Sequence, residues 1–268
     1  MINWREKYVE ADSAIREKGP LVHHITNYVV MNVTANVTLA MGASPVMAHD
    51  SQEVEEMVAF ASAFVINIGT LSPHWVEAML SAGKKAKELG VPVILDPVGA
   101  GATRLRTEVS NQIMTEVCPD IVRGNQAEVT TLAGGIADIQ GVDSLESGEA
   151  PVELFRGLAE AANAVICVTG PVDWVTDGSR VLKVENGDPM MSNVTGTGCS
   201  ASAAVAVFNC SGLPRLEASA MGLAVFGACG EVAAENSQGP GSFQVAILDA
   251  LHNAPGLDLG AKLRISEL

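Results

Sequence analysis

Short apolar runs alternate with longer stretches of helical periodicity up to about residue 170, and this alternation limits the possible folds more than any other feature. The apolar runs predict β-strands at residues 21–24, 63–68, 91–95, 120–122 and 164–169. After Ser72, apolar residues recur at helical spacing with lysines on the opposite side, and Gly90 and Pro92 end the pattern. Units of strand, helix and strand build a parallel sheet that helices cover on both faces. The sequence therefore predicts an α/β protein with a mainly parallel central sheet.

The remaining third of the chain has a different pattern. Residues 172–176 and 180–184 flank the turn signal Asp177-Gly178, which predicts an antiparallel hairpin added to the sheet. From Thr197 to about Leu251 the pattern is mainly helical and rich in small residues. Hydrophobic residues make up 48% of the sequence and aromatic residues only 4%, so we expect a large core of small side chains. Without a linker or repeat, we expect a single domain spanning residues 1–268.

Charge and hydropathy exclude several classes of function. The formal net charge is −15, and such a surface repels a phosphate backbone, so we expect no nucleic-acid partner. No apolar run reaches the roughly 18 residues that span a bilayer, and the N-terminus lacks the layout of a signal peptide. We therefore expect a cytoplasmic protein with no membrane partner. The five cysteines form no zinc-binding spacing, and only Cys199 lies outside apolar or helical surroundings.

The most informative segment is VTGTGC at residues 194–199, which opens a predicted helix rich in Ala, Val and Ser. A glycine-rich turn at a helix start leaves backbone N–H groups unpaired, and the helix dipole favours a phosphate or a developing anion there. Thr197, Gly198 and Cys199 are therefore candidate catalytic residues beside the bound group. The alternative is a tight junction whose glycines only permit close packing.

Polar side chains also follow two of the predicted parallel strands. Asp96 comes directly after the strand at 91–95, on the edge where α/β sheets bind ligands, and its carboxylate could meet magnesium. The alternative is an Asp that caps the next turn. Arg123 could bind a phosphate through its planar fork or form a surface ion pair. Asn125 and Glu128 lie three residues apart, a spacing that fits both a ligand-facing helix start and a capping box.

A further polar segment, His23 to Asn27, ends the first predicted strand. Neighbouring side chains on a strand point to opposite faces, so His23 and His24 cannot share a metal ion. Polar contacts to a substrate fit this segment better, and Asn27 is the candidate for them. Met47 could bring a flexible side chain to a pocket or simply fill the core. Thr169 offers a hydroxyl at the end of another predicted strand.

Together these segments resemble the hydroxyethylthiazole kinases, a family of the ribokinase-like superfamily. The matching segments occur in the family's order over nearly the whole chain, and each is weak alone while the series is specific. They are HITN at 24–27, MNVTAN at 31–36, GASPVM at 42–47, NIGTL at 67–71, DPVGAG at 96–101, RGNQAE at 123–128, VTG at 168–170, VD at 172–173, DG at 177–178, GTGC at 196–199 and GPGSF at 239–243. The resemblance implies a three-layer αβα ribokinase-like fold.

The resemblance also implies a reaction, in which ATP phosphorylates the hydroxyl of 4-methyl-5-(2-hydroxyethyl)thiazole with Mg²⁺ in thiamine biosynthesis. Family members are trimers with active sites between subunits, which implies a homotrimer here. The matching motifs carry over the roles of six residues. Met47 and Gly196 would contact the thiazole, Arg123 and Thr169 would contact ATP, and Asp96 and Glu128 would hold magnesium, mainly through water.

Two positions depart from related patterns. Most ribokinase-like enzymes have Asp as the base where this chain has Cys199, as the thiazole kinases do. A helix N-terminus can lower the pKa of a thiol, yet a thiol is a poorer base than a carboxylate for this step. Phosphoryl transfer relies mainly on positioning and charge stabilisation, so Cys199 would assist proton removal without supplying most of the rate. Pro171 stands where Glu is common in the family.

Three alternatives stay open at this point. The first is a related kinase that acts on a pyrimidine alcohol. The second is an enzyme in which Cys199 attacks an acyl substrate, which requires an orienting histidine. The third is a nucleotide-binding protein without catalytic activity.

Overall fold

One sheet forms the framework of the protein. The computed structural model describes residues 2–135 and 151–268. Its strands are β1 (Leu21–Ile25), β2 (Ser44–Val46), β3 (Ala63–Asn67), β4 (Val93–Asp96), β5 (Ile121–Asn125), β6 (Val165–Thr169), β7 (Asp173–Thr176), β8 (Val181–Val184) and β9 (Ile265–Glu267). In the described residues they form one sheet of order β2-β1-β3-β4-β5-β6-β7-β8-β9. The pairings from β2 to β6 are parallel, and β7, β8 and β9 extend the sheet in antiparallel fashion.

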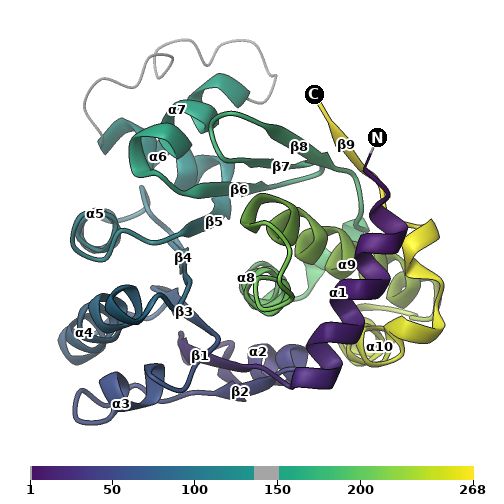
Figure 1. The fold of residues 1–268 in the computed structure, drawn as a ribbon, viewed down its shortest axis with the longest axis horizontal. Coiled ribbons are helices and arrows are strands. Elements are labelled where there is room, and N and C mark those ends of the chain that lie inside the picture. The colour runs from purple at the N-terminus through teal and green to yellow at the C-terminus, as the bar shows by residue number, and fades with distance from the viewer. Residues whose placement is uncertain (1, 136–150) are drawn as a thin grey trace.

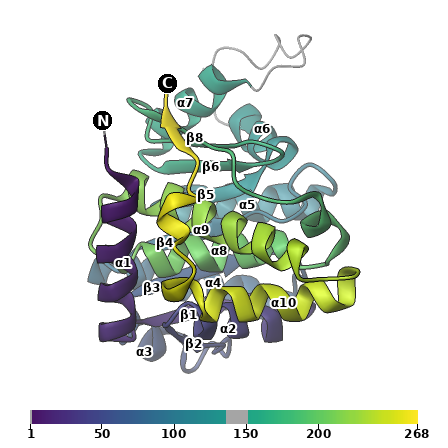
Figure 2. The ribbon, with the colours of Figure 1, turned by 90° about the vertical axis from the view of Figure 1, so that its right-hand side faces the viewer.

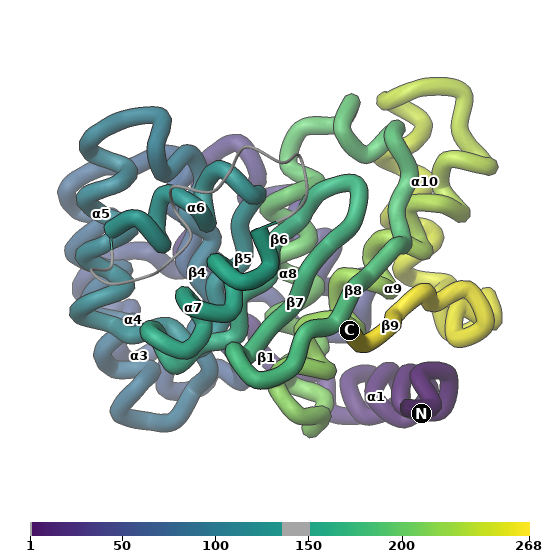
Figure 3. The backbone as a smooth tube through the Cα atoms, turned by 90° about the horizontal axis from the view of Figure 1, so that it is seen from above, coloured from purple at the N-terminus to yellow at the C-terminus, as the bar shows by residue number. Residues whose placement is uncertain are grey.

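Helices cover both faces of the sheet (Figure 1). One face carries α3 (Val54–Val58), α4 (Pro73–Leu89), α5 (Arg104–Glu116), α6 (Gln126–Gly135) and α7 (Val152–Ala162). The other carries α1 (Trp4–Lys18), α2 (Met31–Ala40), α8 (Thr197–Phe208), α9 (Arg215–Glu235) and α10 (Pro240–His252). Viewed from above, the two helical layers lie on opposite sides of the strands (Figure 3). The predicted three-layer αβα fold with a mainly parallel sheet is confirmed.

The helix boundaries follow from local signals in the sequence. Ser72 caps α4 by accepting a hydrogen bond from the backbone N–H of Trp75, and Pro73 occupies the first turn. Gly90 ends the helix in the left-handed region, with φ of +72°, where a side chain is disfavoured. In α1, Tyr8 and Ile15 belong to one buried face. The helix α4 therefore begins and ends where the sequence pattern predicts.

The pair α8 and α9 is packed unusually closely at the centre of one layer. A Cβ at Gly222 of α9 would lie 2.8 Å from the carbonyl oxygen of Ala204 in α8, so only glycine fits at that point. By length and composition α9 could cross a membrane, but 89% of its most apolar window is buried inside the molecule. It contacts α8 on one side and α10 on the other (Figure 2). The small residues predicted after Thr197 thus build a helical core layer.

The predicted strands are all present, with boundaries shifted by no more than a few residues. The hairpin at Asp177-Gly178 is also confirmed, because β7 pairs with β8 in antiparallel register. Two strands, β2 and β9, were not predicted. Each has three residues, which is too short for a strand periodicity to be recognised. β2 places residue 47 at the same edge as the ends of β1 and β3.

Candidate active site

The first turn of α8 faces the carboxyl ends of the parallel strands. Gly196 is the N-cap, with φ of +87°, and a Cβ there would also lie 2.9 Å from Val30. The first helical hydrogen bond runs from the Ser200 N–H to the Gly196 carbonyl, at 2.8 Å. The N–H groups of residues 197–199 therefore have no partner within the helix. The turn has the geometry of an anion site, as the glycine pattern suggested.

Arg123 lies directly against this turn. A Cβ at Gly198 would be 3.2 Å from one terminal guanidinium nitrogen and 3.3 Å from the other, so the glycine leaves room for the cation. The guanidinium donates to the Thr169 hydroxyl and lies 3.6 Å from the Asp96 carboxylate. It is 7% exposed, and its buried Nε has no hydrogen-bond partner. A buried arginine and a helix N-terminus together provide a strongly favourable place for phosphate.

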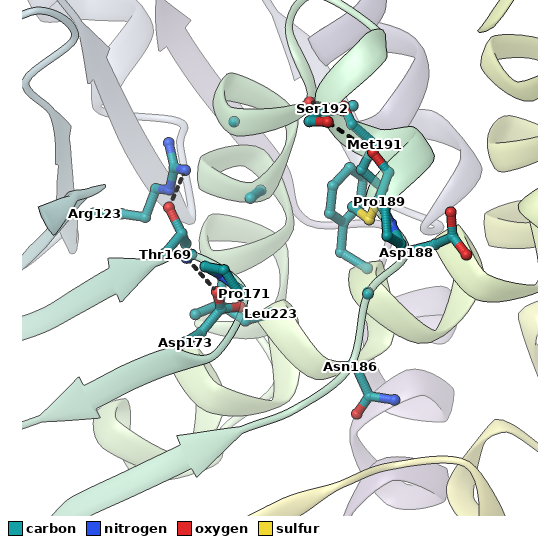
Figure 4. Close-up of a pocket in the computed structure, with 17 residues that line it drawn as sticks. Arg123, Thr169, Pro171, Asp173, Asn186, Asp188, Pro189, Met191, Ser192 and Leu223 are labelled. Carbon is teal, nitrogen blue, oxygen red and sulfur yellow. Dashed lines mark hydrogen bonds between the residues drawn. The ribbon is translucent and has the colours of Figure 1, made fainter. Parts of the chain in front are cut away.

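A pocket of about 620 Å³ opens from this point. Arg123, Thr169 and Gly198 line its polar end, and Leu223 and Phe226 contribute apolar surface. Figure 4 shows Arg123 and Thr169 on one wall, opposite the short helix η2 (Pro189–Asn193). A pocket with a cationic end and an apolar wall suits a ligand that joins phosphates to a flat ring system.

Asp96 is the most deeply buried carboxylate of the site. It is 0% exposed, and its Oδ2 accepts hydrogen bonds from the amide of Asn67 at 2.9 Å and from the Ser202 hydroxyl at 2.8 Å. Its Oδ1 has no partner among the described residues. Burial raises the pKa of Asp96, against a lowering by Arg123. Oδ2 is thus held by two side-chain donors, while Oδ1 accepts no hydrogen bond from the described residues.

Glu128 is both a cap and a neighbour of this site. Its Oε2 accepts from the Asn125 N–H at 2.8 Å, and the Asn125 side chain accepts from the Glu128 N–H at 3.0 Å. This is the reciprocal capping box that the spacing allowed. The second oxygen accepts from the Gly99 N–H at 2.8 Å, which ties the cap to the loop after β4. Both carboxylate oxygens thus accept backbone hydrogen bonds, and the charge of the carboxylate also helps raise the pKa of Asp96.

Cys199 lies between the phosphate end and the side chains after β1. Its Sγ is 3.7 Å from the amide nitrogen of Asn27. Burial raises the pKa of the thiol to about 12, and the Asp96 charge adds to the effect. The helix N-terminus therefore does not produce a thiolate here, contrary to the lowering that the sequence allowed. Thr197 serves a different purpose, since its hydroxyl donates to the Met191 carbonyl at 2.8 Å.

The remaining predicted residues lie at the same edge of the sheet. Met47 is partly buried and directly follows β2, next to the end of β1. His23 and His24 are both buried, with separate partners: His23 bonds the Ala48 carbonyl at 2.8 Å, and His24 bonds the Thr38 hydroxyl at 3.2 Å. Each imidazole thus bonds inside the protein through its Nε2, and substrate contact by this segment stays a prediction. Among the described residues no group of three or more His, Cys, Asp or Glu side chains could hold a metal.

The comparisons with known proteins decide the family. The family model "Hydroxyethylthiazole kinase family" matches residues 13–255. The chain belongs to the hydroxyethylthiazole kinase family. It is 52% identical to the hydroxyethylthiazole kinase of Desulfosudis oleivorans over 98% of this chain and 97% of the relative. The resemblance predicted from the motifs is thereby confirmed.

Solved structures agree with this membership. The fold is similar to that of the hydroxyethylthiazole kinase protein from Pyrococcus horikoshii, with a TM-score of 0.90 and 42% identity over 98% of this chain and 99% of that one. A ribokinase-like superfamily protein from Enterococcus faecalis has a TM-score of 0.68 at 14% identity, covering 94% of both chains. That second likeness shows the fold alone, and it confirms the ribokinase-like architecture.

Sequence reasoning assigned no role to two polar residues of the site in this family member. Asn67 and Ser202 both bond Asp96, and Asn67 was noted only within the matching segment NIGTL. Asn67 had a recognisable signal, because it ends a strand next to the strand that Asp96 ends. Ser202 lies three residues after Cys199 on α8, which places both side chains on one helix face. The pocket wall at η2 and α9 had no sequence signal that we could identify.

Proposed function

We propose that this protein transfers the γ-phosphoryl group of ATP to the hydroxyl of 4-methyl-5-(2-hydroxyethyl)thiazole, in thiamine biosynthesis or salvage. The kinase class follows from family membership. The observation that carries the proposal is the pairing of buried Arg123 with the first turn of α8, at the polar end of a nucleotide-sized pocket. Asn27 and Cys199 lie on the other side of that turn, where the alcohol would approach.

In the proposed reaction the alcohol oxygen attacks the γ-phosphorus, the bond to the β-phosphate oxygen breaks, and ADP leaves. Arg123 and the N–H groups of residues 197–199 stabilise charge on the transferred group, which is the main requirement of a loose transition state. The Cys199 thiol is protonated at neutral pH because its pKa is about 12. Cys199 therefore positions the alcohol, and the alcohol proton passes to an oxygen of the transferred phosphoryl group as the oxygen–phosphorus bond forms.

Mg²⁺ fits the carboxylates of this site. Oxygen donors are its preferred ligands, and the buried Oδ1 of Asp96 has no partner in the described protein. Asp96 and, through water, Glu128 would hold the ion, with Met47 and Gly196 assigned to the thiazole and Arg123 and Thr169 to ATP. When bound, Mg²⁺ supplies positive charge to the phosphates. Asn27 completes the proposed alcohol side.

The competing cysteine-nucleophile mechanism has little support. The amide of Asn27 lies within hydrogen-bonding distance of Cys199 Sγ, and the raised pKa of the thiol disfavours a thiolate. The histidines nearest in sequence to Asn27 bond elsewhere, to Ala48 and Thr38. A pyrimidine alcohol as the substrate is disfavoured by the names of the relatives, which are thiazole kinases.

A single assay tests the reaction. Purified protein with ATP and Mg²⁺ should form ADP only when the hydroxyethyl thiazole is added, and mass spectrometry should detect the thiazole phosphate. Turnover of hydroxymethylpyrimidine with none of the thiazole would reassign the substrate. A trapped acyl-enzyme at Cys199 would instead favour the nucleophile mechanism.

We also propose that residues 1–268 form one kinase domain, that the protein works in the cytoplasm, and that it is a homotrimer whose interface completes the site. Tyr28 and Val29 directly follow Asn27 and are each 65% exposed, which leaves apolar surface beside the alcohol side of the site. Light scattering should give three times the chain mass of 27.8 kDa. A fully active monomer at assay dilution would contradict the trimer.

A further inference from the structure

Asn67 connects the two halves of the site through a chain of directed hydrogen bonds. It ends β3 beside Asp96 and is 1% exposed. Its Oδ1 accepts from the Gly69 N–H at 3.0 Å and from the Asn27 amide at 2.8 Å, while its Nδ2 donates to Asp96 at 2.9 Å. A backbone N–H can only donate, so the bond from Gly69 fixes which end of the Asn67 amide is oxygen.

The Asn27 amide is fixed in the same way. Its Oδ1 accepts from the Val29 N–H at 3.1 Å, which leaves Nδ2 to donate to Asn67 and to approach Cys199. The side chain is 4% exposed. A Cβ at Gly69 would lie 2.5 Å from Asn27 Nδ2, so this glycine keeps open the space that Asn27 occupies. Neither side-chain amide can flip by about 180° without losing its hydrogen bond from a backbone N–H.

On the other side, Asn67 and Ser202 both donate to Oδ2 of Asp96. Together they orient the carboxylate so that Oδ1 is the oxygen without a protein partner. The two donors differ in one respect. Ser202 bonds Asp96 alone, whereas Asn67 bonds both Asp96 and Asn27.

We propose that Asn67 is a positioning residue that holds the carboxylate at the phosphate end and the amide at the alcohol end in one fixed relation. This inference rests on the proposed function for the identity of the two ends. Asn67 touches neither reactant, and it acts through Asp96 and Asn27. Ser202 supports only the Asp96 half.

Three variants test the link from Asn67 to Asp96 and the link from Asn67 to Asn27 separately. Asn67→Ala removes both links, Ser202→Ala removes only a donor to Asp96, and Gly69→Ala pushes Asn27 away without touching Asp96. Calorimetry would measure two equilibrium quantities. One is the affinity for the thiazole alcohol without nucleotide, and the other is the tightening of ADP binding by Mg²⁺. We expect Asn67→Ala to lose about tenfold in both, Ser202→Ala in the second only, and Gly69→Ala in the first only.

Several results would overturn the inference. Thiazole affinity unchanged in Asn67→Ala, or a lowered melting temperature with both binding quantities intact, would make Asn67 merely structural. If Asn67→Ala fails to fold, Asn67→Asp keeps the acceptor for Asn27 and replaces the donor to Asp96. It should then impair only the Mg²⁺-dependent quantity, and impairment of thiazole binding alone would refute the scheme.

Failure of the proposed substrate is distinguishable from failure of this inference. Wild-type protein that binds ADP with Mg²⁺ but not the thiazole alcohol would refute the substrate. The link to Asn27 would then be decided by the side-chain amide resonance of Asn27 in the ligand-free protein. The Asn27 resonance should shift in Asn67→Ala and Gly69→Ala and stay in place in Ser202→Ala. A resonance that shifts in Ser202→Ala and not in the other two variants would contradict the link.

Discussion

Gly198 lies where an added side chain would meet the guanidinium of Arg123. Because the Arg123 guanidinium lies 3.2 Å from the position of an added Cβ, Gly198→Val must displace the cation or tilt the N–H groups of the first turn. We expect turnover to fall by about 10²–10³-fold, the usual loss when a preorganised donor to a developing anion is removed. Steady-state kinetics with ATP varied would measure it, and normal turnover would contradict the phosphate role of this turn.

Cys199 should tolerate change better than Gly198. Cys199→Ser should keep measurable activity, because the thiol is not ionised and a serine hydroxyl can still position the alcohol. Cys199→Asp installs the carboxylate of related kinases and should remain active. The turnover of both should exceed that of Gly198→Val, and Cys199→Ser should keep the wild-type pH profile between about pH 6.5 and 9. An inactive Cys199→Asp beside an active Gly198→Val would indicate a covalent or packing role.

Glu128 has two roles that a matched pair of variants can separate. Glu128→Ala removes the capping box and the carboxylate, so it should lower the free energy of unfolding by about 0.5–2 kcal/mol and raise the Mg²⁺ requirement. Asn125→Ala breaks the same box but leaves the carboxylate, so it should lower stability alone. Asp96→Ala should raise the Mg²⁺ requirement as well. Denaturant titration and Mg²⁺-dependent rates measure the two effects, and equal Mg²⁺ requirements in all three variants would make both carboxylates structural.

The sequence predicted which residues lie at the site better than it predicted the hydrogen bonds and pKa values of those residues. Asp96, Arg123 and Thr169 could be named because each lies at or just after the carboxyl end of a predicted buried strand, and parallel strands end at one edge. The bond network of Asn67 could not be predicted, because it depends on the register of β3 against β4. The raised pKa of Cys199 was also out of reach, since it depends on burial by segments distant in the sequence.

At the scale of elements, the α8–α9 contact should limit the size of residue 222. Gly222→Ala places a methyl group 2.8 Å from the Ala204 carbonyl oxygen, so the helices must separate. We expect a loss of about 1–3 kcal/mol in the free energy of unfolding. Gly134→Ala in α6 is the matched control, because a Cβ there meets nothing within 4 Å, and it should gain up to about 1 kcal/mol. Chemical denaturation measures both, and equal stabilities would show that the contact can relax.

Helices and strands differed in how well their sequences predicted them. α4 was predictable because its cap, its periodicity and its terminal glycine agree with one another. β9 was not, because three residues near the C-terminus pair only with β8, and that pairing forms when the chain returns to the hairpin. Short edge strands depend on tertiary contacts rather than on local preference.

At the scale of the whole molecule, the two ends of the chain are held together. Glu217 of α9 is 6% exposed and forms ion pairs with Lys7 of α1 and with Arg180 of the hairpin. Arg180 also pairs with Glu267 of β9 at 2.7 Å. Figures 1 and 2 both show the N-terminal helix and the C-terminal strand close together. A chain with a net charge of −15 thus places two of its 16 lysines and arginines, Lys7 and Arg180, at the junction of its termini.

Global stability should fall in mildly acidic solution because of His24. Burial lowers the pKa of His24 to about 3, from an ordinary value near 6.5 in the unfolded chain. Between these pH values the unfolded state binds a proton at His24 and the folded state does not. The free energy of unfolding is therefore unaffected by this group above pH 6.5 and falls as the pH falls below it. The loss from this group approaches about 1.4 kcal/mol for each pH unit below 6.5.

Asp173 acts in the opposite sense, since burial raises its pKa to about 6 and folding then favours its protonated form. The comparison must therefore be between variants rather than within one pH series. His24→Leu replaces the titrating ring with an apolar side chain of similar volume. The difference in the free energy of unfolding between wild type and His24→Leu should shift against wild type as the pH falls from 6.5 to 5. Urea titrations at fixed protein concentration measure it, and a difference independent of pH would show that folding does not lower the pKa of His24.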